Sequence, residues 1–381
     1  MFDFTRLAIL PDELALSYRA RLARVNGWES AALVAENLSI WIGRQLPNDT
    51  KLSGVEVLAY VAGMGVTQFV RSHTMLPFQR AVVGSLEEVP HGCTDRRSLL
   101  EKRAYCATRE HFYFCRACAE EDMNARGTPY WRRSHQLPGM LWCTQHEIPL
   151  TKAVSTTEHL VLPNDCHEKS EPVPLEEVNA ARSNPNVLRF INISSDMLAS
   201  ERPIHESNVY KIVKDRIKNI QEEPGGHVFP ILQSRFSESL FDLSWLNNVF
   251  TRGNKTAEQT LKSLDDLITR GTKGVNSVGY ALLLACLYET SDEAMNQLTA
   301  LDSNLRPRKR SNSEAERSLL NDQALRDAYF AGLGNHVTIA KNLGLQRLEV
   351  KRRMETLGLP PKRDLTVSDL LRNTIAHKDK N

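Results

Sequence analysis

The chain has 381 residues, of which 41% are apolar and 25% are charged, a composition typical of a globular protein with about two or three domains. No apolar run approaches the roughly 20 residues that a membrane span needs. The opening segment MFDFTRLAIL lacks the basic and apolar regions of a signal peptide. We therefore expect a cytoplasmic protein, and in that reducing compartment the seven cysteines indicate metal binding in preference to disulfides.

The formal net charge of +2 hides an uneven distribution along the chain. Residues 301–381 carry 16 Lys/Arg against 10 Asp/Glu, whereas the residues before them carry 32 against 36. Any contact with nucleic acid should therefore concentrate at the C-terminal end. A solvated charged surface explains the same composition equally well.

Helical periodicity dominates the N-terminal region. Apolar residues recur at helical spacing within Pro11–Asn26 and Gly27 follows, which predicts an amphipathic helix with a glycine stop. Similar patterns in 30–38 and 55–62 predict two more helices. We expect an N-terminal helical unit of the helix-turn-helix kind. The apolar positions of the first helix are Leu14, Tyr18, Leu22 and Val25.

The predicted fold is mainly α, with a small metal-binding module between helical regions. Proline-rich and glycine-rich breaks suggest the boundaries between the regions. The module itself shows weak helical periodicity and many aromatic residues, so we expect it to need a metal to fold. Helical patterns in 209–220, 256–268 and 278–290 predict the second helical domain. In chain order we expect an N-terminal helical region (1–104), a zinc-finger module (105–150), a polar linker (151–208), a helical domain (209–300), a basic flexible connector (301–316) and a C-terminal helix-turn-helix (317–381).

Four metal-binding side chains stand in two equally spaced pairs, Cys115-x2-Cys118 and Cys143-x2-His146. A two-residue gap lets one turn present both side chains to a tetrahedral ion, and three thiolates with one imidazole form a usual structural zinc set. Because the protein fills all four positions, we expect one structural Zn²⁺ that performs no chemistry. Buried cysteines beside an unrelated histidine are the alternative interpretation.

Motifs for a second metal or for catalysis are not found in the sequence. Cys166-His167 is the best remaining ligand pair, but its polar surroundings predict an exposed dipeptide in a loop. We find no HExxH, P-loop, GxSxG or spaced Asp/Asp/Glu set, so we expect no catalytic residues and no enzyme.

Three stretches carry a resemblance to a known family. They are PDELALSYRARLARVNG (11–27), SHTMLPF (72–78) and FCRACAEEDMNARGTPYWRRSHQLPGMLWCTQHEIPL (114–150). These stretches resemble the TniQ/TnsD family of transposon target-selection proteins. The resemblance rests on a helix motif, a His-Thr segment, the paired ligands, and the Tyr-Trp-Arg and Gln-Leu-Pro-Gly motifs, which follow one another in the same order as in the family. The single finger and the chain length favour the shorter TniQ-type organisation.

The resemblance implies an adaptor that links a target-recognition element to the AAA+ ATPase regulator and the transposase. That element is either a DNA attachment site or a CRISPR Cascade ribonucleoprotein that supplies RNA-guided specificity. A homodimer is among the expected assemblies. Arg132 and Arg133 are candidates for phosphate or partner contacts, or are solvated. The alternative function is a zinc-stabilised helix-turn-helix transcription regulator.

Residues 321–358 predict three short helices. Ala340, Gly344 and Val350 have the small-residue, turn-glycine and apolar spacing of a helix-turn-helix, with Val350, Met354 and Leu357 facing inward. The outer face of the third helix would then meet nucleic acid, although the same fold can serve as a protein-docking platform. The candidate nucleic-acid-binding residues are Gln346, Arg347, Lys351, Arg352, Lys362 and Arg363.

Overall fold

The chain divides into two compact units, Met1–Asn304 and Leu305–Asn381. Helices predominate over short strands in both, which confirms the mainly α fold. Among the described residues, no helix combines the length and the hydropathy of a membrane span. The computed structural model describes residues 4–43, 52–84, 89–94, 100–101, 108–153, 160–222, 240–250, 277–304, 324–329, 335–343, 347–357 and 359.

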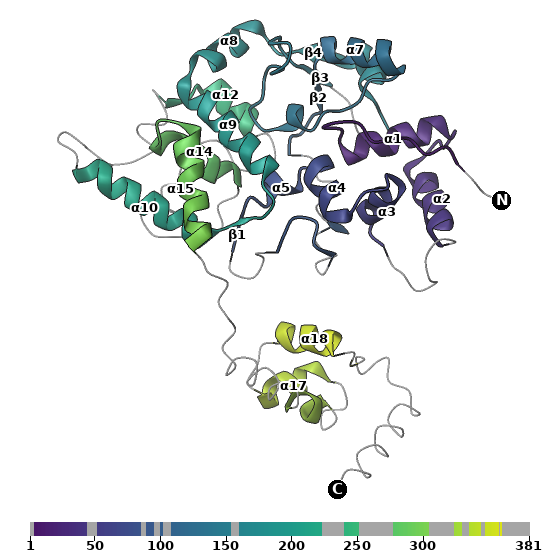
Figure 1. Ribbon diagram of the computed structural model, residues 1–381, viewed down its shortest axis with the longest axis vertical. Helices are drawn as coiled ribbons and strands as arrows, with labels where there is room; N and C mark the ends of the chain where they lie inside the picture. Colours follow the sequence, from purple (N-terminus) through teal and green to yellow (C-terminus); the bar gives the residue numbers. More distant parts are fainter. Residues whose placement is uncertain are drawn as a thin grey trace. The chain divides into compact units, whose positions relative to one another are not determined.

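The N-terminal helices gather at one end of the first unit, in purple in Figure 1. They share a core of side chains such as Tyr18, Leu22 and Phe69, of which Tyr18 and Leu22 were predicted from the periodicity. The first helix ends where predicted, because Gly27 adopts a φ of +66°, although Val25 on that helix is exposed. The helices are α1 (Ala15–Val25), α2 (Ala31–Gly43), α3 (Gly54–Val61) and α4 (Val66–His73).

A three-stranded antiparallel sheet brings together the two parts of the chain that carry the predicted metal ligands. Its order is β2 (Tyr113–Phe114), β3 (Thr151–Ala153) and β4 (Ser170–Pro172). Phe114 pairs with Thr151, so the residue just before Cys115 lies beside the residue just after the 143–150 loop. A second small sheet pairs β1 (Val82–Val83) in parallel with β5 (Ile204–His205).

Shorter elements complete the region around this sheet. The helix α7 (Arg116–Arg126) follows β2 directly and ends at Gly127, whose φ is +71°. The remaining short elements are α5 (Leu76–Gln79), the 3-10 turn η2 (Ser134–Gln136) and the 3-10 helix η3 (Pro163–Lys169).

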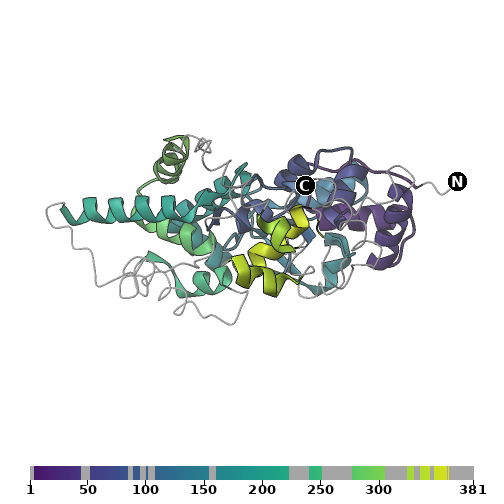
Figure 2. The ribbon, with the colours of Figure 1, turned by 90° about the horizontal axis from the view of Figure 1, so that it is seen from below.

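Helices after residue 174 form the other end of the first unit (Figure 1). The central helix α9 packs against α5, α14 and α15, and α10 packs along α14 and α15 (Figure 2). The predicted helix over 256–268 lies outside the described residues. The helices are α8 (Leu175–Ser183), α9 (Pro185–Ala199), α10 (Glu206–Glu222), α12 (Leu243–Val249), α14 (Ser277–Leu287) and α15 (Ser291–Asn304).

The expectation of a polar linker over 151–208 is wrong. Asn184 caps α9 by accepting hydrogen bonds from the backbone N–H groups of Asn186 and Val187. The polar segment NISSDMLA (192–199) lies within α9, where Ile193 and Met197 are buried and Ser195 and Asp196 are exposed. Long-range packing makes this polar segment part of the main core.

One hydrophobic core runs through the sheet region and the later helices. Trp131, Phe190, Trp245 and Leu283 all belong to it. Trp245 also donates a hydrogen bond from Nε1 to the Gly139 carbonyl at 3.0 Å. Gly139, at the end of the Gln-Leu-Pro-Gly motif, is therefore a packing site for α12.

The described residues of the second unit form three short helical segments, residues 324–329, α17 (His336–Leu343) and α18 (Arg347–Thr356). Their buried residues form a core of their own, made of Leu325, Tyr329, Ile339, Ala340, Val350 and Met354. Leu357 packs against the same core. The predicted inward face of the last helix is thereby confirmed.

Candidate metal centre

The four predicted ligands come from the two segments that β2 and β3 bring together. Cys115 occupies the N-cap of α7 and Cys118 lies in the first turn of that helix. Cys143 and His146 lie in a tight turn, in which the Glu147 N–H donates to the Cys143 carbonyl at 2.8 Å. A bridge between Trp142 and Pro149 closes this turn, so both ligand pairs have a fixed backbone.

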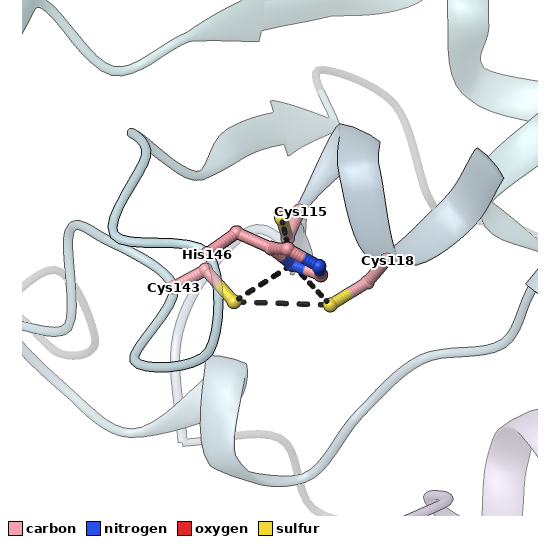
Figure 3. Close-up of side chains that lie close together, drawn as sticks. All are labelled: Cys115, Cys118, Cys143 and His146. Atoms are coloured by element: carbon pink, nitrogen blue, oxygen red, sulfur yellow. Dashed lines mark hydrogen bonds between the residues drawn. The ribbon is translucent and has the colours of Figure 1, made fainter. Parts of the chain in front are cut away.

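The donor atoms of these residues converge on one point (Figure 3). His146 Nδ1 lies 3.5 Å from Cys115 Sγ, 3.3 Å from Cys118 Sγ and 3.7 Å from Cys143 Sγ. The Cys118 and Cys143 sulfurs are 3.7 Å apart. In a tetrahedral site with metal–sulfur bonds of about 2.3 Å, two sulfurs lie about 3.8 Å apart. The four residues therefore form a cluster that fits a tetrahedral metal ion.

The surroundings suit a charged metal–thiolate group. All three cysteines are buried, while the His146 side chain is 18% exposed. Cys115 and Cys118 lie at the N-terminus of α7, where the helix dipole favours the thiolate form. Four protein ligands complete a tetrahedral shell, which is the arrangement of structural and not of catalytic zinc sites.

The second ring nitrogen of His146 also has a partner. Nε2 lies 2.9 Å from Oε1 of Glu121, a residue of α7. This hydrogen bond raises the pKa of His146 above its ordinary value. Gln145 donates to the other oxygen of the same carboxylate at 3.2 Å.

Cys166 does not lie in an exposed dipeptide, so that expectation is wrong. Its side chain is 2% exposed and belongs to the main core. Burial raises the pKa of the Cys166 thiol to about 11, which makes it unreactive. Across the described part of the chain, the cluster at residues 115–146 is the one group of three or more His, Cys or acidic residues placed to hold a metal.

The segment between the two ligand pairs is bound to the N-terminal helices. The carboxylate of Asp12 accepts from the Ser134 N–H at 3.0 Å and from the Ser134 hydroxyl at 2.6 Å. Ser17 on α1 accepts from the Trp131 N–H at 3.0 Å, and the Leu14 N–H donates to the Trp131 carbonyl at 2.9 Å. We call these contacts the junction. They place α1 directly against the metal-binding segment.

Two buried groups stabilise the N-terminal side of the junction. Glu13 is fully buried and forms a 2.7 Å ion pair with Arg21. Burial raises the pKa of Glu13 to about 7, while Arg21 acts in the opposite direction. His73, the histidine of the SHTMLPF stretch, bonds through Nδ1 to the Glu13 carbonyl at 2.8 Å, and burial lowers its pKa.

Arg132 and Arg133 have internal partners. The Arg132 guanidinium forms 2.6 Å and 3.2 Å hydrogen bonds with buried Asp122 of α7 and lies over the Tyr130 ring. Arg133 pairs with Asp12 and donates to the backbone carbonyls of Arg71 and Thr74. The two side chains are only 15% and 12% exposed. They therefore hold the fold together and are neither solvated nor placed for phosphate contact.

The predicted nucleic-acid-binding residues are described only in part. Arg347 and Lys351 are exposed on α18, whereas Val350 of the same helix is buried. Arg352 lies in the same helix, but its side chain is outside the described atoms. The other three residues, Gln346, Lys362 and Arg363, lie outside the described residues.

These features define a mainly helical protein in which a Cys₃His cluster that could hold a metal ion is joined to an N-terminal group of helices. Residues 4–150 match the family model of TniQ, so this part of the chain is a TniQ domain and the predicted family resemblance is confirmed. Both the metal centre and the junction lie within the matched residues. A comparison with curated proteins gave no match.

Proposed function

We propose that the chain is a target-selection adaptor in DNA transposition. The observation that carries this proposal is the TniQ domain over residues 4–150, since TniQ proteins are a family of non-catalytic transposition adaptors. In this role the chain links a target-recognition element to the AAA+ ATPase regulator and the transposase, performs no catalysis itself and acts in the cytoplasm.

The division of the chain into two units supports an adaptor role. An adaptor has to bind two partners at once, and two separate compact units offer two independent surfaces. The first unit holds the Cys₃His cluster and a core that runs from the sheet region through the later helices, which favours a rigid platform. The described part of the second unit has a small helical core, with the basic residues Arg347 and Lys351 exposed on α18.

We propose that the metal is one structural Zn²⁺, bound by Cys115, Cys118, Cys143 and His146. The donor set and the distances between the donor atoms support this choice of ion. Metal analysis of the purified chain should give one zinc per molecule. The double variant Cys118→Ala/Cys143→Ala should lose that zinc, and zinc retained at wild-type stoichiometry would contradict the assignment.

We further propose that the second unit is a helix-turn-helix that contacts nucleic acid. The support is the spacing of Ala340, Gly344 and Val350 together with the exposure of Arg347 and Lys351 on α18. Gln346, Arg352, Lys362 and Arg363 extend the proposed surface in the sequence. Target DNA is the partner when the chain selects an attachment site directly, and the Cascade ribonucleoprotein is the partner in RNA-guided integration.

Copurification separates these two mechanisms. The full chain is mixed with a short target duplex, with Cascade loaded with guide RNA, or with buffer, and each mixture is run through size exclusion. Stable co-elution with Cascade supports RNA-guided selection, and co-elution with the duplex supports direct selection. If neither partner is retained in a mixture that also holds the ATPase, the adaptor proposal is wrong. Duplex binding without any effect on transposition would favour the transcription regulator.

A further inference from the structure

The helix that supplies two metal ligands also supplies a carboxylate aimed at a third ligand. Glu121 follows Cys118 by three residues on α7, so both side chains leave the same face of the helix. Cys118 Sγ lies 3.3 Å from His146 Nδ1, and Glu121 Oε1 lies 2.9 Å from His146 Nε2. The imidazole is therefore held between two residues of a single helix.

The two ring nitrogens have different tasks in this arrangement. Nδ1 faces the three sulfurs, so it must keep its lone pair for the metal. Nε2 must then carry the proton, and the Glu121 carboxylate accepts the hydrogen bond from it. Gln145 donates a hydrogen bond to the second oxygen of the Glu121 carboxylate at 3.2 Å, which fixes the orientation of that carboxylate.

We infer that Glu121 is a positioning residue of the metal centre, which fixes the ring orientation and the tautomer of His146 and so raises the affinity for the ion. The inference rests on the proposed zinc centre. Carboxylates that accept a hydrogen bond from a ligating histidine typically contribute 10- to 100-fold to metal affinity. Because the Glu121 side chain is 56% exposed, the effect should lie toward the lower end of that range.

The chain offers a matched control in Glu120, the exposed preceding residue of α7, whose side chain leaves the helix in another direction. Full-length wild type, Glu121→Ala, Glu121→Gln and Glu120→Ala are loaded with zinc. The zinc dissociation constant is then measured by competition with a chromogenic chelator at pH 7. Glu121→Ala should bind zinc roughly tenfold more weakly than wild type. Glu121→Gln keeps an acceptor oxygen and should fall between the two, while Glu120→Ala should match wild type.

A second measurement separates positioning from general destabilisation. The ¹⁵N resonances of the His146 ring report its tautomer, and in zinc-loaded wild type Nε2 should carry the proton. In Glu121→Ala the Nε2 proton should lose its hydrogen-bonded shift. A zinc affinity of Glu121→Ala within about threefold of Glu120→Ala, with unchanged ring resonances, would overturn the inference. Failure of wild type to bind zinc at all would instead contradict the proposed zinc centre and the inference with it.

Discussion

Replacing Gly139 with Ala tests the packing of the TniQ domain on the later helices. Gly139 has a φ of +73°, and an added Cβ would lie 2.7 Å from the Trp245 ring and 2.8 Å from Val249. The left-handed conformation costs an alanine about 1 kcal/mol, and overpacking in a filled core costs about 1–3 kcal/mol more. We therefore expect Gly139→Ala to lower the free energy of unfolding by about 2–4 kcal/mol.

Gly127 provides the control, because its φ is nearly the same at +71° and an alanine Cβ at that position would meet no packed neighbour within 4 Å. Gly127→Ala should therefore cost only the backbone part, about 1 kcal/mol. Both variants are compared with wild type by urea unfolding, followed by far-ultraviolet circular dichroism. Equal losses of stability in the two variants would refute the close contact between Gly139 and α12.

Two further predictions concern acid stability and the second unit. Burial lowers the pKa of His91 to about 3, so below pH 6.5 the unfolded chain binds a proton at His91 that the folded chain does not bind, and this residue should contribute a loss of about 2 kcal/mol in stability between pH 7 and pH 5. His91→Gln should remove that loss in urea titrations, and an unchanged pH dependence would contradict it. Changing Arg347, Lys351 and Arg352 to Ala should leave the free energy of unfolding within about 0.5 kcal/mol of the wild-type value. The same variant should give a shallower slope of log binding constant against log salt concentration, by about one unit for each phosphate that the three side chains neutralise. Val350→Asp should unfold this unit instead, and wild-type binding by the triple variant across a salt series would refute the nucleic-acid role.

Local patterns predicted what depends on local geometry. The paired spacing of Cys115, Cys118, Cys143 and His146 was sufficient to predict that they cluster, because a two-residue gap restricts how one turn can present two side chains. The apolar spacing before Gly27 likewise predicted the helix α1 and its end. The inward face of α18 followed from the same helical period.

Contacts between distant segments could not be predicted in the same way. Asp12 and Ser134 are separated by 122 positions in sequence, and nothing in the sequence shows that they form a hydrogen bond. The helix α9 was mistaken for a loop because its Asn and Ser residues have weak helix propensity, which burial of its apolar face overcomes. The only sequence feature that relates Glu121 to the site is its spacing of three residues from Cys118. That spacing predicts a contact with His146 only once the position of His146 is known.

The most direct measurement of the proposed role is a transposition assay in cells that carry the transposon ends, the transposase, the AAA+ ATPase and the target-recognition element, with and without this chain. Insertion sites are mapped by sequencing. With the chain present, insertions should concentrate at the selected target, and without it they should fall to background or scatter. Insertions at the same target and the same frequency in its absence would contradict the account.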